Sequence, residues 1–124
     1  MPMIEIKLPY PPSVNNYYRT FQGRMLISRE GRQYKETVGL MALTCGLKRV
    51  DGRVEVECYV VPPDNRKRDL DNVGKCLLDS IKGHLFEDDG HIDRLTLVRL
   101  PVQAPGCVVV RIRPAGKQEI PSHG

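Results

Sequence analysis

The segment RKRDLDNVGK, residues 66–75, places strong positive charge directly beside strong negative charge. Three cations come first, and two aspartates follow with one residue between them: Arg66, Lys67, Arg68, Asp69 and Asp71. A salt-bridge ladder on a helix would interleave the two signs along one face, whereas here a cationic block abuts an anionic pair. This order favours a polyanion that docks beside a metal site.

The residues from about Asp69 to Lys82 predict a helix that ends near Gly83, because their apolar side chains recur at helical spacing. These apolar positions fall in one arc of about 100° that should face a sheet: Leu70, Gly74, Leu77, Leu78 and Ile81. At the edge of that arc, Asp71, Lys75 and Asp79 form a stripe that would line a cleft. Asp69 can point toward the same cleft, but capping and the helix dipole also favour a carboxylate at a helix start.

A second acidic group, FEDDGHID, follows this helix and contains Glu87, Asp88 and Asp89 in a predicted turn. A simple return from helix to strand would leave this turn roughly 20 Å from Asp69, unless the segment doubles back or the site includes another chain. An ordinary acidic turn remains an alternative. Clustered carboxylates need a cation, because two unit charges about 4 Å apart repel by roughly 4 kcal/mol. Carboxylate oxygens suit Mg²⁺ or Mn²⁺.

The composition indicates one globular domain and excludes several classes of protein. The chain has 124 residues, a net charge of +4, 40% hydrophobic and 27% charged residues. It has no paired Cys and His spacing for zinc, no nucleotide-binding glycine motif and no serine nucleophile elbow. The four cysteines are expected to be reduced core residues. No signal peptide or long apolar run is present, so we expect a cytoplasmic protein without a membrane partner.

Period-two alternation and turn residues predict the strands. MIEIKL and RVEVECYVV alternate clearly, two later strands are expected at IDRLTLVRL and CVVVRI, and RMLI after Gly23 is a candidate short strand. A helix that begins near Arg29, capped by Ser28, should end near Gly46. We therefore predict an α+β fold, a small single domain with a mixed sheet of about four strands covered by two helices. Residues 1–113 would form this domain and 114–124 a flexible tail.

Four segments together resemble the RusA-like Holliday junction resolvases, the crossover junction endodeoxyribonucleases of bacteria and their phages: LPYPPSVNNYYR, SREGRQY, RKRDLDNVGKCLLDSI and FEDDGHI. The resemblance covers nearly the whole chain. Its specific part is the basic run into D-L-D-N, the lysine four residues after the second aspartate, and the D-D turn about seventeen residues further on. It implies a small homodimeric nuclease, without a nucleotide cofactor, that makes paired nicks in four-way DNA junctions with Mg²⁺ or Mn²⁺.

The resemblance also implies roles for individual residues. Asp69, Asp71 and Asp89 would be the metal-binding catalytic acids, and Lys75 the essential lysine. It implies that the D-D turn returns to the first two aspartates. Three further candidates belong to the same motifs: Asp88, Asp79 and Asn72. Asp79 is equally explained by an ion pair with Lys75. Arg66, Lys67 and Arg68 would bind the DNA backbone.

Two other functions remain open, and a third is disfavoured by size. The first is another metal-dependent nuclease that acts on flaps or nicked duplex, and the second is a basic DNA-binding module whose acids merely cap helices. A sugar-nucleotide transferase with a DxD motif normally needs a larger domain than 124 residues allow. For a dimer, the outer apolar residues of the first helix or an edge strand such as CVVVRI could supply the contact.

Overall fold

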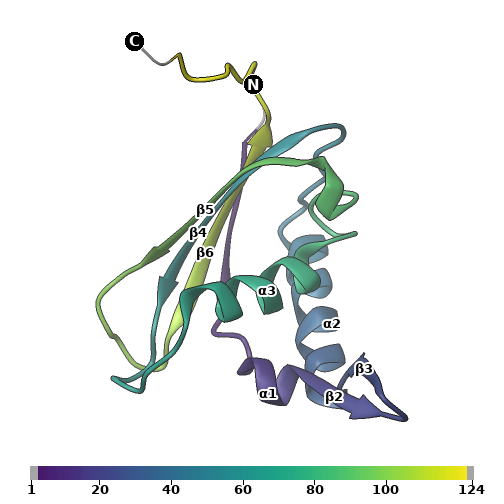
Figure 1. The fold of residues 1–124 in the computed structure, drawn as a ribbon, viewed down its shortest axis with the longest axis vertical. Helices are drawn as coiled ribbons and strands as arrows, with labels where there is room; N and C mark the ends of the chain where they lie inside the picture. Colours follow the sequence, from purple (N-terminus) through teal and green to yellow (C-terminus); the bar gives the residue numbers. More distant parts are fainter. Residues whose placement is uncertain (1–2, 123–124) are drawn as a thin grey trace.

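The computed structural model describes residues 3–122 and places one four-stranded sheet beside two main helices (Figure 1). The sheet has the order β1-β6-β4-β5, formed by β1 (Ile4–Pro9), β6 (Cys107–Pro114), β4 (Val54–Val61) and β5 (Ile92–Arg99). The pairs β1–β6 and β6–β4 are antiparallel, whereas β4 and β5 are parallel. The helix between β4 and β5 makes this parallel pairing possible. The predicted α+β fold with a mixed four-stranded sheet is confirmed.

Alternating residues give the sheet one buried face and one polar face. The inward positions of β4 and β6 are fully or almost fully buried: Val54, Val56, Cys58, Val60, Val108, Val110 and Ile112. The outward positions carry ion pairs between strands, with Arg111 Nε 2.5 Å from Glu5 Oε1 and Arg113 Nε 3.0 Å from Glu55 Oε1. The helices therefore cover only the apolar face of the sheet.

Helix α2 (Arg29–Thr44) begins where the sequence predicts, because Ser28 Oγ accepts a hydrogen bond from the Gly31 N–H at 3.0 Å. Helix α3 (Leu70–Ile81) also lies within its predicted range. Its buried face is turned slightly from the predicted arc, since Cys76 and Ser80 are fully buried and Leu78 is only half-buried. This rotation of the buried face has a packing reason, because α3 contacts the other helices as well as the sheet.

A short helix and a hairpin precede α2 and extend away from the sheet at the lower right of Figure 1. They are α1 (Val14–Tyr17), β2 (Tyr18–Phe21) and β3 (Arg24–Ile27), with β2 and β3 paired antiparallel. The hairpin turn uses positive φ angles at Gln22 and Gly23, which the primed two-residue turns require. The RMLI strand is confirmed, whereas α1 and β2 were not predicted, because VNNYYRTF has neither a helical nor a two-residue period.

Strand β6 corrects one expectation about assembly. CVVVRI was considered as an edge strand, but β6 lies between β1 and β4 and pairs with both. Its hydrogen-bonding edges are therefore occupied, and the edges of this sheet are β1 and β5.

The cysteines are free, and they divide between core and surface. Cys58 and Cys76 are fully buried, as expected, but Cys45 is exposed and Cys107 only partly buried. Within residues 3–122, no helix combines the length and apolar character needed to cross a membrane.

Candidate active site

Helix α3 lies between two hollows that contain most of the predicted site residues. The first, here called the acidic cleft, has a volume of about 380 Å³ and lies between α3 and β5. It is lined by Asp71, Gly74, Lys75, Leu78, Asp79, Asp89, Leu95 and Leu97. The stripe that the helical spacing predicted therefore faces one cleft, and Asp89 from the second acidic segment joins it. This segment does return to the flank of α3.

Asp89 lies toward the opposite end of α3 from Asp71. It begins the short 3₁₀ turn η1 (Asp89–His91), and its Oδ2 is 3.8 Å from Lys82 Nζ just beyond the helix end. Asp71 stands in the first turn of a 12-residue helix, which is about 18 Å long at 1.5 Å per residue. Within residues 3–122, no three His, Cys, Asp or Glu side chains are close enough to hold a metal ion. A single chain thus brings Asp71 and Asp89 to one cleft without closing a three-carboxylate site.

Asp88 has a different environment from its neighbour. Its Oδ2 accepts a hydrogen bond from the Gly90 N–H at 3.2 Å, which caps the η1 turn. Its carboxylate does not line the acidic cleft. The geometry therefore distinguishes the two aspartates of the D-D turn, with Asp89 facing the cleft and Asp88 supporting the turn.

The second hollow, here called the basic groove, has a volume of about 470 Å³ at the start of α3. Its charged and amide-bearing lining residues are Arg66, Lys67, Arg68, Asp69, Asn72, Asn15 and Asn16. Asp69 precedes α3 in an extended conformation, with φ −82° and ψ 127°, and its side chain makes no capping hydrogen bond. Asp69 therefore lines the basic groove and not the acidic cleft of Asp71 and Asp89, and its side chain does not cap α3.

The three cations of the groove are not equivalent. Arg68 Nη1 is 2.7 Å from Asp64 Oδ1, its guanidinium lies 5.4 Å from the centre of the Tyr10 ring, and its carbonyl accepts a hydrogen bond from Arg99. The hydrogen bond from Arg68 lowers the pKa of Asp64 to about 2. The Arg68 side chain is 23% exposed, whereas that of Arg66 is 83% exposed. Arg68 thus organises the loop before α3, and Arg66 and Lys67 present their charge to solvent.

Lys75 and Asp79 do not form the ordinary ion pair that their spacing allows. Among the described residues, no salt bridge within 4.0 Å joins them. Asp79 Oδ2 instead accepts a hydrogen bond from the Tyr18 hydroxyl, and Lys75 Nζ lies 4.9 Å from the centre of the Tyr18 ring. Tyr18 was not predicted as a site residue.

Comparisons with known proteins identify the family of this chain. The family described as Endodeoxyribonuclease RusA matches residues 9–113, from the last residue of β1 to the penultimate residue of β6. The chain belongs to this RusA family. Crossover junction endodeoxyribonuclease RusA of Escherichia coli strain K12 is 35% identical over 118 residues, covering 91% of this chain and 96% of that protein. The corresponding proteins of Enterobacteria phage 82 and Shigella sonnei strain Ss046 are each 36% identical with the same coverage.

Family membership confirms the resemblance that the motifs indicated, and it identifies a family of nucleases that act on DNA. In this RusA-family chain, the helical periodicity of α3 positions Asp71, Lys75 and Asp79 on the cleft. Tyr18 contacts two of the cleft-lining residues, Lys75 and Asp79, from a separate hairpin, 61 residues before Asp79 in the sequence. A tyrosine in a turn-rich segment carries no periodic signal, so sequence reasoning had no means to find it.

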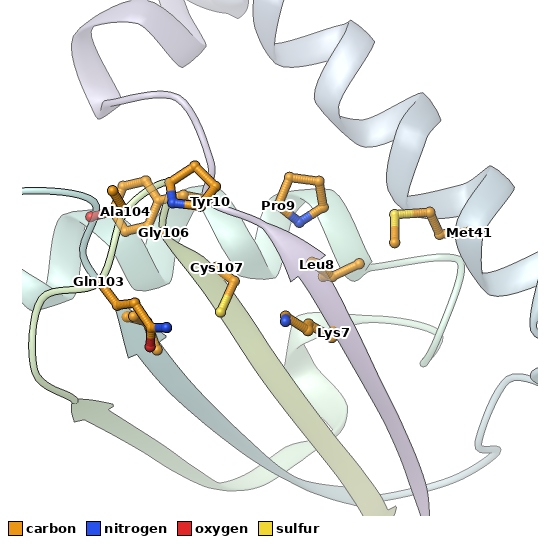
Figure 2. Close-up of a pocket in the computed structure, with 11 residues that line it drawn as sticks. Lys7, Leu8, Pro9, Tyr10, Met41, Gln103, Ala104, Gly106 and Cys107 are labelled. Carbon is orange, nitrogen blue, oxygen red and sulfur yellow. The ribbon is translucent and has the colours of Figure 1, made fainter.

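A third hollow of about 530 Å³ contains none of the predicted site residues. Figure 2 shows Leu8 and Pro9 on β1, Met41 on α2 and Cys107 at the start of β6 around it. Lys7 is the only charged residue among those that line it. This apolar lining suits neither a metal ion nor a phosphate, so the acidic cleft and the basic groove remain the candidate active site.

Proposed function

We propose that this RusA-family chain is a crossover junction endodeoxyribonuclease that resolves four-way DNA junctions by paired, symmetric nicks. The observation that carries the proposal is the position of an acidic cleft and a basic groove on two sides of one helix, α3. Arg66 and Lys67 would hold the phosphate backbone, and the carboxylates would act on a phosphate beside them. The relatives named as crossover junction endodeoxyribonucleases support the choice of substrate.

The proposed cofactor is Mg²⁺, with Mn²⁺ able to replace it, and its candidate ligands are Asp69, Asp71 and Asp89. The donor chemistry fits, because carboxylate oxygens are hard ligands and Mg²⁺ commonly takes one or two of them plus substrate phosphate oxygens. Within residues 3–122, one chain does not gather three carboxylates around a single point. Phosphate oxygens of the DNA, or a second subunit, would complete the ligand set. When bound, the ion would activate water and stabilise charge on the scissile phosphate.

A homodimer follows from the proposed reaction. Two nicks in strands related by two-fold symmetry need two sites, and one chain has one acidic cleft. Two exposed apolar surfaces can supply the contact. One is the edge strand β5, where Leu95 is 42% exposed beside the cleft, and the other is the outer face of α2, with Leu40 64% and Leu43 76% exposed.

Light scattering at micromolar concentration should report about 28 kDa, twice the 14.0 kDa mass of the chain. A monomer that still makes paired nicks would contradict the dimer. A monomer that nicks only once would favour the alternative of a general structure-selective nuclease.

The cations of the basic groove should affect DNA binding differently. Arg66→Ala should weaken junction binding and reduce the slope of log K against log salt by about 1, because one exposed phosphate contact is lost. Arg68→Ala should lower the melting temperature more than Arg66→Ala, since it removes the pairing with Asp64 and the packing on Tyr10. Filter binding across a salt series and thermal melting measure the two effects. Equal melting temperatures for the two variants would refute the structural role of Arg68.

A gel assay that compares a four-way junction, a flap and a linear duplex tests the proposed substrate. Preferential cleavage of the junction supports the proposal, and equal cleavage of the flap favours the general nuclease. Binding of the junction without cleavage in Mg²⁺ or Mn²⁺ would favour the non-catalytic module. We further propose that the protein acts in the cytoplasm of a bacterium, encoded by the bacterium or by a phage.

A further inference from the structure

Tyr18 joins the hairpin to the candidate active site through two contacts with α3. It is the first residue of β2 and also the C-cap of α1, where its N–H donates to the Val14 carbonyl. Its ring packs on the Tyr17 ring, with centres 4.7 Å apart and planes tilted by 55°. Tyr17 is fully buried, and its hydroxyl is 2.7 Å from Ser80 Oγ on α3. Tyr18 therefore packs on a core residue, Tyr17, whose hydroxyl is hydrogen-bonded to Ser80 of α3.

The Tyr18 side chain contacts Lys75 and Asp79, which line the acidic cleft from the second and third turns of α3. The hydroxyl donates to Asp79 Oδ2, and the face of the ring receives Lys75 Nζ at 4.9 Å. Burial, with the hydrogen bond to Asp79, raises the pKa of Tyr18 far above its usual value. The phenol therefore remains a neutral donor to Asp79 across the working range of pH.

These contacts leave the Lys75 ammonium available for a phosphate. Lys75 is exposed, and a lysine side chain has several rotatable bonds, so without a contact it would sample many positions. A salt bridge to Asp79 would restrain it but would also neutralise its charge. The ring restrains Lys75 by a cation–π contact and uses none of its N–H donors on a carboxylate, while the hydroxyl occupies Asp79.

We propose that Tyr18 is a positioning residue that holds Lys75 over the acidic cleft and keeps Asp79 from pairing with it. The inference rests on the proposed function, in which Lys75 stabilises charge on the phosphate. Tyr18 itself touches neither DNA nor metal in this role. Its removal should lower the rate of cleavage through Lys75 and leave junction affinity almost unchanged.

A double-mutant cycle tests this role. Tyr18→Leu in the wild-type background should lower kcat about tenfold, because a loosely held catalytic group is misplaced by an ångström or more. In a Lys75→Ala background the same substitution should lower kcat by less than about twofold, since there is no ammonium left to position. Tyr18→Phe keeps the ring and should retain more activity than Tyr18→Leu. An equal loss from Tyr18→Leu in both backgrounds would overturn the inference.

A matched control and a second measurement separate positioning from general damage. Tyr59 makes a comparable cation–π contact on the polar face of the sheet, where the Arg111 guanidinium lies 5.4 Å from its ring centre. Tyr59→Leu removes this contact and should not change kcat. In NMR spectra of the free wild-type protein, the ring current of Tyr18 should shift the Lys75 ε-methylene protons upfield. The same shift should appear in Tyr18→Phe, which keeps an aromatic ring, and should be absent from Tyr18→Leu. Absence of this shift in wild type would overturn the inference even if cleavage falls.

The outcomes also separate this inference from the proposed function. If wild type binds junctions and does not cleave them, the proposed function fails, and the role of Tyr18 in catalysis fails with it. If wild type cleaves and Tyr18→Leu cleaves equally well, only the role of Tyr18 fails.

Discussion

Asp71→Asn should abolish junction cleavage while junction binding is retained. The neutral amide is a poor ligand for Mg²⁺, so the proposed reaction would lose a required carboxylate. The exposed cations of the basic groove lie on the other side of α3 and keep their charge, so affinity for the junction should stay the same or rise slightly. Cleavage assays in Mg²⁺ and in Mn²⁺, with gel-shift binding of the same junction, measure both parts.

The fold should tolerate Asp71→Asn. Asp71 is exposed, and its Oδ1 accepts a hydrogen bond from the Asn72 N–H at 3.0 Å, which an asparagine oxygen can also accept. The loss of a negative charge in the first turn of α3 should cost no more than about 0.3–1 kcal/mol. Asp51→Asn is a suitable control, because this aspartate is 88% exposed in a loop outside both hollows, and its rate should equal that of wild type. Wild-type turnover by Asp71→Asn would rule out the metal site.

Lys75→Ala should lower the rate of cleavage by about 10²-fold or more, because a preorganised positive charge beside the reacting phosphate is lost. Junction binding should fall little, since this lysine is one of 19 Lys and Arg residues in the chain. Single-turnover cleavage, with enzyme in excess over junction, separates the rate of the chemical step from binding.

The competing explanation of Lys75 is a helix ion pair with Asp79, which would be worth only about 0.3–0.5 kcal/mol. The structure disfavours it, because Asp79 accepts from Tyr18 instead. Lys48→Ala removes an exposed lysine outside the candidate site and serves as the control for a lost charge. A rate for Lys75→Ala within about twofold of that control would contradict a role in catalysis.

The sequence alone determined the strands of the main sheet, the two long helices and the composition of the acidic stripe. Period-two alternation located β1 and β4, and Ser28 located the start of α2, because these signals depend on neighbouring residues only. For the same reason, the side of α3 that carries Asp71, Lys75 and Asp79 could be predicted from 100° per residue. The resemblance to the family was also fully contained in the order of the motifs.

Only the tertiary structure decided which distant segments meet. Helical periodicity could not place Asp69, because its backbone is extended and its side chain lies in the basic groove. The strand order put β6 in the middle of the sheet, since pairing with both β1 and β4 depends on contacts far apart in sequence. Arg68 is less exposed than Arg66 because it packs on Tyr10 and pairs with Asp64, and neither contact can be read from the RKR run.

The contact of Tyr18 with Lys75 and Asp79 is the clearest case of what sequence could not determine. Tyr18 and Asp79 are 61 residues apart, and their meeting requires α1 to end at Tyr17, the hairpin to begin there, and Tyr17 to fill the core against Ser80. No local period or motif specifies that combination. Local propensity therefore fixed the side of α3 on which Lys75 stands, whereas core packing decided which aromatic ring holds it.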